Sequence, residues 1–209
     1  MGVGVLVLGH SGSGKSTSLR NFEPDEIGVF NVAGKPLPFR KHLPTADNSG
    51  YEQITSVLAQ AKQRAYVIDD ANYLMAFDSF KKAKQTGYGK FTEIAVNFEL
   101  LLEAIRHAPK DTIVYVMMHP DYDDAGRMKP KSIGKMLDNQ LCIEGLFSIV
   151  LEAYGNETGY HFRTNDPGGI AKSPLDMFEQ PIIDNDLKAV DAAIREYWQL
   201  APLGGDNNA

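Results

Sequence analysis

Short apolar runs alternate with amphipathic stretches along the chain. The runs Val3–Leu8, Ile27–Val32, Ala65–Ile68 and Thr112–Met118 are rich in β-branched residues and predict strands that are buried on both faces. Thr92–His107 carries apolar residues at helical spacing and is the clearest predicted helix. Because predicted strands and helices alternate, we expect an α/β fold with a mostly parallel central sheet flanked by helices.

Weaker patterns complete the expected fold. Phe147–Tyr154 and Tyr160–Thr164 flank the sequence Gly-Asn-Glu-Thr-Gly, which predicts an antiparallel hairpin at one edge of the sheet. Residues 33–50 are rich in proline and residues 78–92 are polar and basic, so we expect both to be loops. Further helices are expected at Lys15–Asn21, Tyr51–Gln63 and Asp186–Leu200.

A complete phosphate-binding motif follows the first predicted strand. Residues 9–16 read Gly-His-Ser-Gly-Ser-Gly-Lys-Ser and match G-x-x-x-x-G-K-[ST] without a mismatch. The glycines allow the backbone to wrap closely around phosphate oxygens, and the helix expected next adds its positive N-terminus. The motif therefore predicts ATP binding through Gly9, Gly12, Ser13, Gly14, Lys15, Ser16 and Thr17.

Individual roles follow from the chemistry of the motif. We expect Lys15 to reach the β- and γ-phosphates, Ser16 to ligate Mg²⁺ through its hydroxyl, and Thr17 to support the α-phosphate side. Asp69 ends an apolar strand some 50 residues later, which is where such sites place a second Mg²⁺-binding carboxylate. Asp70 is a candidate for polarising the attacking water, with a solvated or helix-capping carboxylate as the alternative.

A polar residue also ends the fourth predicted strand. Active sites of parallel α/β sheets lie at the carboxyl ends of strands, so His119 is expected to sense the γ-phosphate. An ordinary loop histidine is the alternative. No glutamate closes the strand Ile27–Val32, where the sequence continues Ala33-Gly34-Lys35, and the identity of the catalytic base stays open.

Composition narrows the class of protein. The chain has 209 residues with 21 Lys plus Arg and 27 Asp plus Glu, for a formal charge of −6, so nucleic-acid binding requires a local basic patch. The only cysteine, Cys142, excludes an intrachain disulfide and is expected to be buried. No segment approaches the roughly 18 apolar residues of a membrane span, so we expect a cytoplasmic protein with no membrane contact. Residues 1–200 form one predicted domain, followed by a flexible tail at 201–209.

The order of these features resembles the RecA-like P-loop ATPase core. More narrowly, it is similar to small bacteriophage ATPases, some of which act in single-strand annealing recombination. The resemblance covers most of residues 3–180, and only the phosphate loop is sharply specific. The matching segments are Gly9–Thr17, Tyr66–Asp70, Gly87–Lys90, His119, Lys135–Asn139 and Ala171–Pro174. The chain departs from RecA in lacking a glutamate after its second strand and in having His119 where RecA has glutamine.

Two basic segments gain a meaning from this resemblance. Lysines neutralise phosphates and aromatic rings stack on bases, which is the usual composition of a single-stranded nucleic-acid site. The resemblance implies that both segments line a DNA channel, with solvated lysine-rich loops as the alternative. Their candidate residues are Lys81, Lys82, Lys84, Tyr88 and Lys90 in the first segment, and Arg127, Lys129, Lys131 and Lys135 in the second.

The resemblance also implies assembly with copies of the same chain into a ring or filament. Lys172, or less favourably Arg163, matches the position from which such proteins send a cation into a neighbour's ATP site. The leading hypothesis is a Mg²⁺-dependent ATPase that acts on single-stranded DNA in phage recombination or replication, in the host cytoplasm. A small-molecule or nucleotide kinase is one alternative, although no arginine-rich lid is visible. A non-hydrolysing ATP-binding regulator is the other.

Overall fold

A single large sheet organises the molecule. The computed structural model describes residues 1–134, 137 and 140–204, and within them the sheet has eight strands in the order β10-β9-β8-β1-β5-β4-β2-β3. The neighbours from β8 to β3 pair in parallel, whereas β8–β9 and β9–β10 pair antiparallel. The strands are β1 (Val3–Leu8), β2 (Ile27–Asn31), β3 (Thr45–Asp47), β4 (Ala65–Asp69), β5 (Ile113–Met118), β8 (Ile149–Asn156), β9 (Gly159–Arg163) and β10 (Ile182–Asp184).

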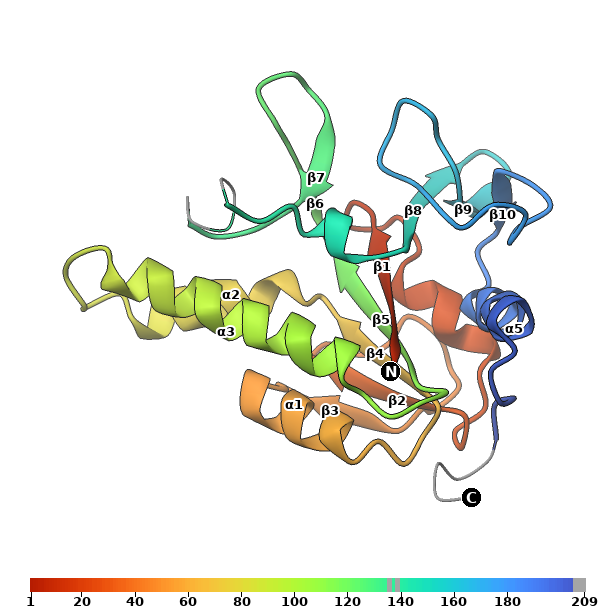
Figure 1. Ribbon diagram of the computed structural model, residues 1–209, viewed down its shortest axis with the longest axis horizontal. Helices are drawn as coiled ribbons and strands as arrows, with labels where there is room; N and C mark the ends of the chain where they lie inside the picture. Colours follow the sequence, from red (N-terminus) through yellow and green to blue (C-terminus); the bar gives the residue numbers. More distant parts are fainter. Residues whose placement is uncertain (135–136, 138–139, 205–209) are drawn as a thin grey trace.

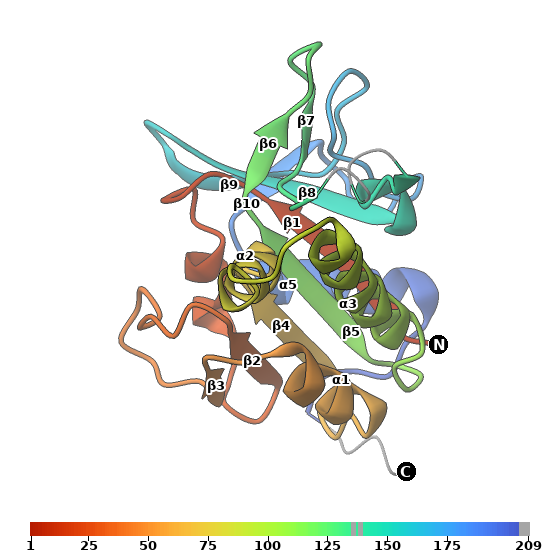
Figure 2. The ribbon, with the colours of Figure 1, turned by 90° about the vertical axis from the view of Figure 1, so that its left-hand side faces the viewer.

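Helices cover both faces of this sheet. The helices are α1 (Tyr51–Ala59), α2 (Asn72–Lys81), α3 (Gly89–Arg106), α5 (Leu187–Trp198) and the 3₁₀ segments η1 (Ser16–Asn21) and η2 (Glu144–Leu146). Figures 1 and 2 show α1, α2 and α3 on one face and η1 and α5 on the other. The molecule is therefore a three-layer α/β fold with a mostly parallel sheet in the middle layer, as the alternating pattern predicts.

The strand pattern explains why both faces need a cover. In β1, Val5 and Val7 pack toward η1 and α5, while Leu6 and Leu8 pack toward the layer of α1, α2 and α3. All of these side chains are fully buried. Burying an aliphatic side chain of this size contributes roughly 1.5–3 kcal/mol, so an apolar strand in this position is stable only between two helical layers.

Several expected elements differ in the structure. The expected loop 33–50 contains β3, a three-residue strand that pairs with β2. The expected loop 78–92 is mostly helix, because α2 continues to Lys81 and α3 already begins at Gly89. The helix expected over Lys15–Asn21 is a 3₁₀ helix that begins at Ser16 and ends before Pro24. A helix of this length adds little dipole to the phosphate loop, so backbone N–H groups must contribute most of the positive potential.

The carboxyl end of the sheet carries more structure than the sequence pattern predicts. The hairpin β8–β9 is present, but β10 lies outside it and forms the edge. A second hairpin, β6 (Pro120–Tyr122) with β7 (Met128–Pro130), projects just beyond β5. Figure 1 shows this hairpin and the segment between β9 and β10 projecting side by side from the same end of the sheet. Among the described helices, none combines the length and the apolar character that crossing a membrane requires.

Candidate phosphate-binding site

The phosphate loop connects β1 to η1 in a conformation that depends on its glycines. Gly12 and Gly14 have φ values of +79° and +90°, a region that other residues rarely adopt. A Cβ atom on Gly9 would lie 2.6 Å from the carbonyl oxygen of Ala153 on β8, so only glycine fits there. The motif glycines are therefore required by the backbone of the loop, as the sequence predicts.

Lys15 is folded onto its own loop. Its Nζ atom donates hydrogen bonds to the carbonyl oxygens of Gly9 at 2.6 Å and His10 at 3.0 Å, and the residue is only 5% exposed. Burial lowers the pKa of Lys15 to about 8, although the charges of Asp70 and Asp69 oppose the shift. The side chain therefore lies at the site that the motif predicts, where a bound anion would favour its charged form.

Ser16 and Asp69 meet across the site. The Ser16 hydroxyl donates a hydrogen bond of 2.8 Å to Asp69 Oδ2, although the two residues are 53 positions apart. Asp69 is buried, and its other oxygen, Oδ1, has no hydrogen-bond partner among the described residues. Burial and the neighbouring charge of Asp70 raise the pKa of Asp69. The two side chains that the sequence assigns to Mg²⁺ are thus in contact, and Asp69 Oδ1 is a second, buried acceptor beside them.

This pair suits a metal that arrives with a ligand. Among the described residues, no group of three or more His, Cys, Asp or Glu side chains is placed to hold a metal ion by itself. Mg²⁺ usually keeps several waters and is bound by one or two protein oxygens together with substrate phosphates. Ser16 and Asp69, next to a phosphate loop, fit that donor set.

Asp70 is held between two nitrogen-bearing side chains. It forms an ion pair with Lys35 Nζ, and its Oδ1 lies 3.2 Å from His119 Nε2. Burial disfavours the charged carboxylate, but hydrogen bonds from His119 and Lys35 outweigh it and lower the pKa of Asp70 to about 2. His119 is itself held at the strand end, because its backbone N–H donates to Asn72 Oδ1 at 3.1 Å. Asp70 is therefore a fixed negative charge rather than a ready proton acceptor.

A cavity of about 270 Å³ joins these groups. It is lined by residues 11–17 of the phosphate loop and by Lys35, Asp70 and His119. Tyr160, from the start of β9, closes one side with its ring against Gly14, where a Cβ atom would lie 2.7 Å from the tyrosine Cγ. Because β5 lies between β1 and β4 in the sheet, His119 comes to lie between the phosphate loop and Asp70.

The β6–β7 hairpin is attached to this site at two points. His10, in the phosphate loop, shares a hydrogen bond of 2.9 Å with the Tyr122 hydroxyl, and the two rings stack. At the base of the hairpin, the Lys131 backbone N–H donates to the His119 carbonyl oxygen at 2.9 Å. The sequence pattern assigns no role to His10. Its contact with Tyr122 depends on the β6–β7 hairpin, whose strands are short and contain prolines, so the sequence pattern does not predict them.

The first basic segment is only partly available as a cationic surface. Lys82 is paired with Asp78 at 2.8 Å and with Glu93 at 3.0 Å, and Lys90 lies over the ring of Phe91. Lys81, Lys84 and Tyr88 are exposed at the turn between α2 and α3. Figures 1 and 2 show this turn at the free end of the two helices, away from the β6–β7 hairpin.

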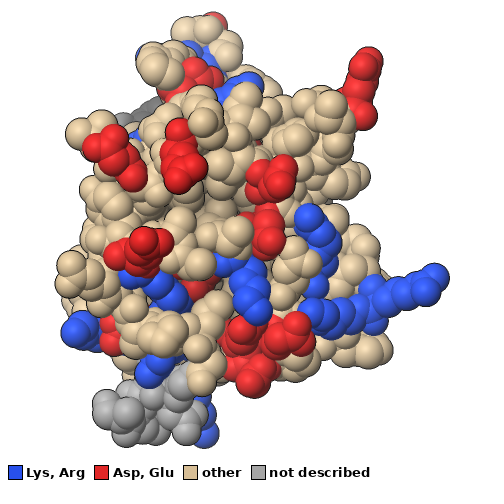
Figure 3. Space-filling view, turned by 90° about the vertical axis from the view of Figure 1, so that its right-hand side faces the viewer, with Lys and Arg blue, Asp and Glu red and all other residues tan. Residues whose placement is uncertain are grey.

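The second basic segment is the β6–β7 hairpin and the residues after it. Arg127 is paired with Asp123 at 2.8 Å across the turn of the hairpin, and Lys129 lies on β7. Lys131 is exposed and lies with His10 and His119 around a separate cavity of about 380 Å³. Lys135 lies outside the described residues. On the face that carries α5, Figure 3 shows acidic and basic side chains interspersed, with one group of basic side chains at the lower right.

A larger cleft, of about 890 Å³, lies between the β6–β7 hairpin and the segment after β9. Arg163 lines this cleft but is held by Glu152 at 2.7 Å and by Asp166 at 3.4 Å, and it lies over the ring of Tyr154. Lys172 lines the same cleft, and its backbone pairs with Val150. Neither cation lines the phosphate cavity of its own chain. Arg163 is therefore held within its own chain, whereas Lys172 forms no ion pair with a described residue.

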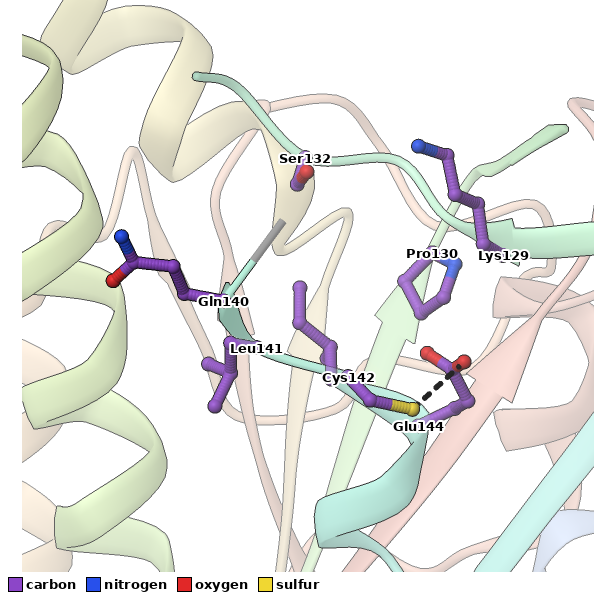
Figure 4. Close-up of a pocket in the computed structure, with 8 residues that line it drawn as sticks. Lys129, Pro130, Ser132, Gln140, Leu141, Cys142 and Glu144 are labelled. Carbon is purple, nitrogen blue, oxygen red and sulfur yellow. Dashed lines mark hydrogen bonds between the residues drawn. The ribbon is translucent and has the colours of Figure 1, made fainter. Parts of the chain in front are cut away.

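Cys142 is exposed, so the expectation of a buried thiol is wrong. Its Sγ donates a hydrogen bond of 3.0 Å to Glu144 beside a shallow pocket between β7 and η2 (Figure 4). The hydrogen bond with Glu144, followed by burial, raises the pKa of the Cys142 thiol. A raised pKa keeps the thiol protonated and makes it a poor nucleophile.

Comparisons with known proteins give no family for the chain. No protein-family model matches it, and the search of curated proteins found no match. The site is therefore defined by its own geometry. The structure adds Lys35, Tyr160 and the contact between His10 and Tyr122 to the residues that the sequence singles out. Their roles depend on which strands become neighbours, a property that no local motif encodes.

Proposed function

We propose that the chain is a Mg²⁺-dependent P-loop ATPase of RecA-like type that acts on single-stranded DNA in phage recombination or replication. The observation that carries the proposal is the 2.8 Å hydrogen bond between Ser16 and Asp69, beside a buried Asp69 oxygen without a partner. In P-loop sites, Mg²⁺ is held through the hydroxyl group of the last motif residue and through the carboxylate at a strand end.

In this proposal, the phosphate loop binds the phosphates through its backbone N–H groups. Lys15 exchanges the carbonyl oxygens of Gly9 and His10 for phosphate oxygens. Ser16 and Asp69 hold Mg²⁺, which neutralises phosphate charge when it is bound. His119 and Asp70 lie at the end of the cavity where the terminal phosphate and the attacking water are expected.

One observation favours a second candidate function, the non-hydrolysing ATP-binding regulator. The pKa of Asp70 is lowered to about 2, and its carboxylate is occupied by Lys35 and His119. A carboxylate in that state accepts a proton poorly, so binding without turnover is the expected behaviour if Lys35 never leaves Asp70.

DNA binding is supported by composition and position more than by a single surface. Lys81, Lys84 and Lys131 are the exposed lysines of the two basic segments that form no ion pair with a described residue. Single-stranded nucleic acid is bound by cations that neutralise phosphates and by rings that stack on bases, and Tyr88, four positions after Lys84, is 88% exposed.

ATP turnover with and without single-stranded DNA, beside Lys15→Ala, tests the proposal. DNA-stimulated hydrolysis that Lys15→Ala abolishes supports the ATPase. Phosphorylation of an added nucleoside or sugar without a DNA effect supports a kinase, and nucleotide binding without turnover supports the regulator.

Replacing Lys81 and Lys84 by alanine tests the DNA site separately. The slope of log affinity against log salt should become shallower by about 0.7 for each single-strand phosphate contact that is lost. Replacing Lys62 and Lys110, which lie on other segments of the chain, is the matched control. An unchanged slope for the first pair would remove this segment from the DNA site.

A further inference from the structure

The phosphate cavity contains a second lysine that the motif does not predict. Lys35 follows β2, and its side chain reaches Asp70 at the end of β4 because these two strands are neighbours in the sheet. Among the described residues that line the cavity, Lys15 and Lys35 are the only lysines or arginines. No glutamate closes β2, and Lys35 brings a second positive charge to the phosphate cavity.

The backbone of Lys35 is fixed by its neighbours, whereas its side chain is partly exposed and is held by the ion pair with Asp70 alone among the ion pairs of the described residues. The buried side chain of Asn31 donates hydrogen bonds of 2.7 Å to the Lys35 carbonyl oxygen and to Asp47. Gly34 has a φ value of +64°, and Pro36 restricts the backbone of the residue before it. In contrast, the Lys35 side chain is 53% exposed, and Lys35 lines the phosphate cavity. This arrangement places a partly exposed cationic group on a fixed backbone.

We propose that Lys35 is a γ-phosphate-binding residue supplied by the chain itself, and that it exchanges Asp70 for the terminal phosphate when a nucleoside triphosphate binds. The inference rests on the proposed function and deepens it. A terminal phosphate carries more negative charge than a carboxylate and offers three oxygens to the ammonium group. The triphosphate therefore competes with Asp70 for Lys35, whereas a diphosphate ends one phosphate short of it.

The exchange has a consequence for Asp70. In the nucleotide-free chain the carboxylate is neutralised by Lys35 on one side and contacted by His119 on the other. Once Lys35 has moved to the phosphate, one Asp70 oxygen is free to accept a hydrogen bond from a water molecule next to the terminal phosphate. The ion pair with Lys35 thus keeps Asp70 from accepting this hydrogen bond until a triphosphate is present.

The test compares the affinity of the Mg²⁺ complexes of ADP and of a non-hydrolysable ATP analogue, measured by calorimetry. In Lys35→Met, affinity for the analogue should fall about 10- to 100-fold, as expected for the loss of a hydrogen bond between charged groups, while affinity for ADP changes less than about threefold. Lys35→Arg should restore most of the difference, because arginine keeps the charge. Lys41→Met, which removes a lysine bound to Glu23 near the same loop, is the matched control and should change neither affinity.

Lys35→Met leaves Asp70 buried without its ion pair, so stability needs a separate check. The double variant Lys35→Met/Asp70→Asn removes the uncompensated charge and should show the same selective loss of analogue binding. If all variants bind both nucleotides like the wild type, or lose both equally, Lys35 has a purely structural role and the inference is wrong while the proposed function stands. If the wild type binds neither nucleotide, the proposed function fails and the inference fails with it.

Discussion

Asp69→Asn should stabilise the nucleotide-free chain and at the same time abolish its response to Mg²⁺ and ATP. The carboxylate is 2% exposed, one of its oxygens has no partner among the described residues, and burial and Asp70 raise its pKa. These features make the charge of Asp69 unfavourable when no cation is bound to it. Asparagine has nearly the same shape, still accepts the hydrogen bond from Ser16, and removes the charge.

The magnitude follows from ordinary mutational and ligand-binding energetics. Relieving such a site typically adds roughly 0.5–2 kcal/mol to the free energy of unfolding. In a domain of this size, 1 kcal/mol corresponds to about 2–4 °C, so Tm should rise by roughly 1–8 °C. The wild type should gain about 2.7 kcal/mol, or roughly 5–11 °C, when Mg²⁺–ATP is present at 100 times its dissociation constant. The variant should gain little.

The order of stability of the two proteins should therefore reverse on ligand addition. Thermal denaturation followed by circular dichroism, with and without Mg²⁺–ATP, measures both states. Asp25→Asn is the matched control, because it makes the same chemical change at an exposed position and should leave both transitions unchanged. A nucleotide-free Asp69→Asn protein that is less stable than the wild type would refute the electrostatic argument. A full ligand shift in the variant would refute the assignment of Asp69 to Mg²⁺.

Two further predictions concern parts of the chain away from the phosphates. Tyr115→Phe removes the 2.8 Å hydrogen bond to Asp191 in a fully buried network, and Asp191→Ala leaves the buried Arg195 without its ion pair. In urea denaturation, the free energy of unfolding should fall by about 1.5–3 kcal/mol for Tyr115→Phe and by about 3–5 kcal/mol for Asp191→Ala. Equal losses would contradict the inference that Asp191 compensates the buried charge of Arg195. The pKa of Asp123 is lowered first by the backbone N–H of Arg127 and then by its side chain, so this carboxylate stabilises the turn above its ordinary pKa and loses that effect as pH falls through the lowered value. Arg127→Ala should move the Asp123 pKa upward in an NMR titration, and an unchanged midpoint would show that Arg127 does not hold the turn.

Local signals made the phosphate loop and its strand predictable. The motif is contiguous, and its glycines are required by backbone geometry that the structure reproduces at Gly12 and Gly14. The contact between Ser16 and Asp69 could also be predicted from the sequence, because parallel strands align their carboxyl ends at one edge of the sheet. The sequence therefore predicts both halves of the candidate metal site, although they lie far apart in the chain.

The sequence does not predict α2, β6 or β7, because the hydrophobic pattern of each is weak. In α2 the apolar side chains of Phe77 and Phe80 are exposed, so the hydrophobic spacing does not describe a single buried face. Strands β6 and β7 have three residues each and contain Pro120 and Pro130, which gives too few positions for an alternating pattern. The role of Lys35 depends on the adjacency of β2 and β4, which only the assembled sheet provides.

The two candidate cations, Lys35 and Lys172, differ in whether they would need a second copy of the chain to reach a bound phosphate. Lys172 lines a cleft that does not include the phosphate loop, so under the proposed function it would act on a transferred phosphoryl group only in a neighbouring copy. Lys35 lines the phosphate cavity of its own chain and requires no neighbour. A site served by Lys35 alone works in a single chain, whereas a site that also needs Lys172 works only in an assembly. The hairpin that carries Tyr122 contacts the phosphate loop through His10 and also lines the cleft of Lys172, so the proposed function predicts that nucleotide binding and this cleft are coupled through His10.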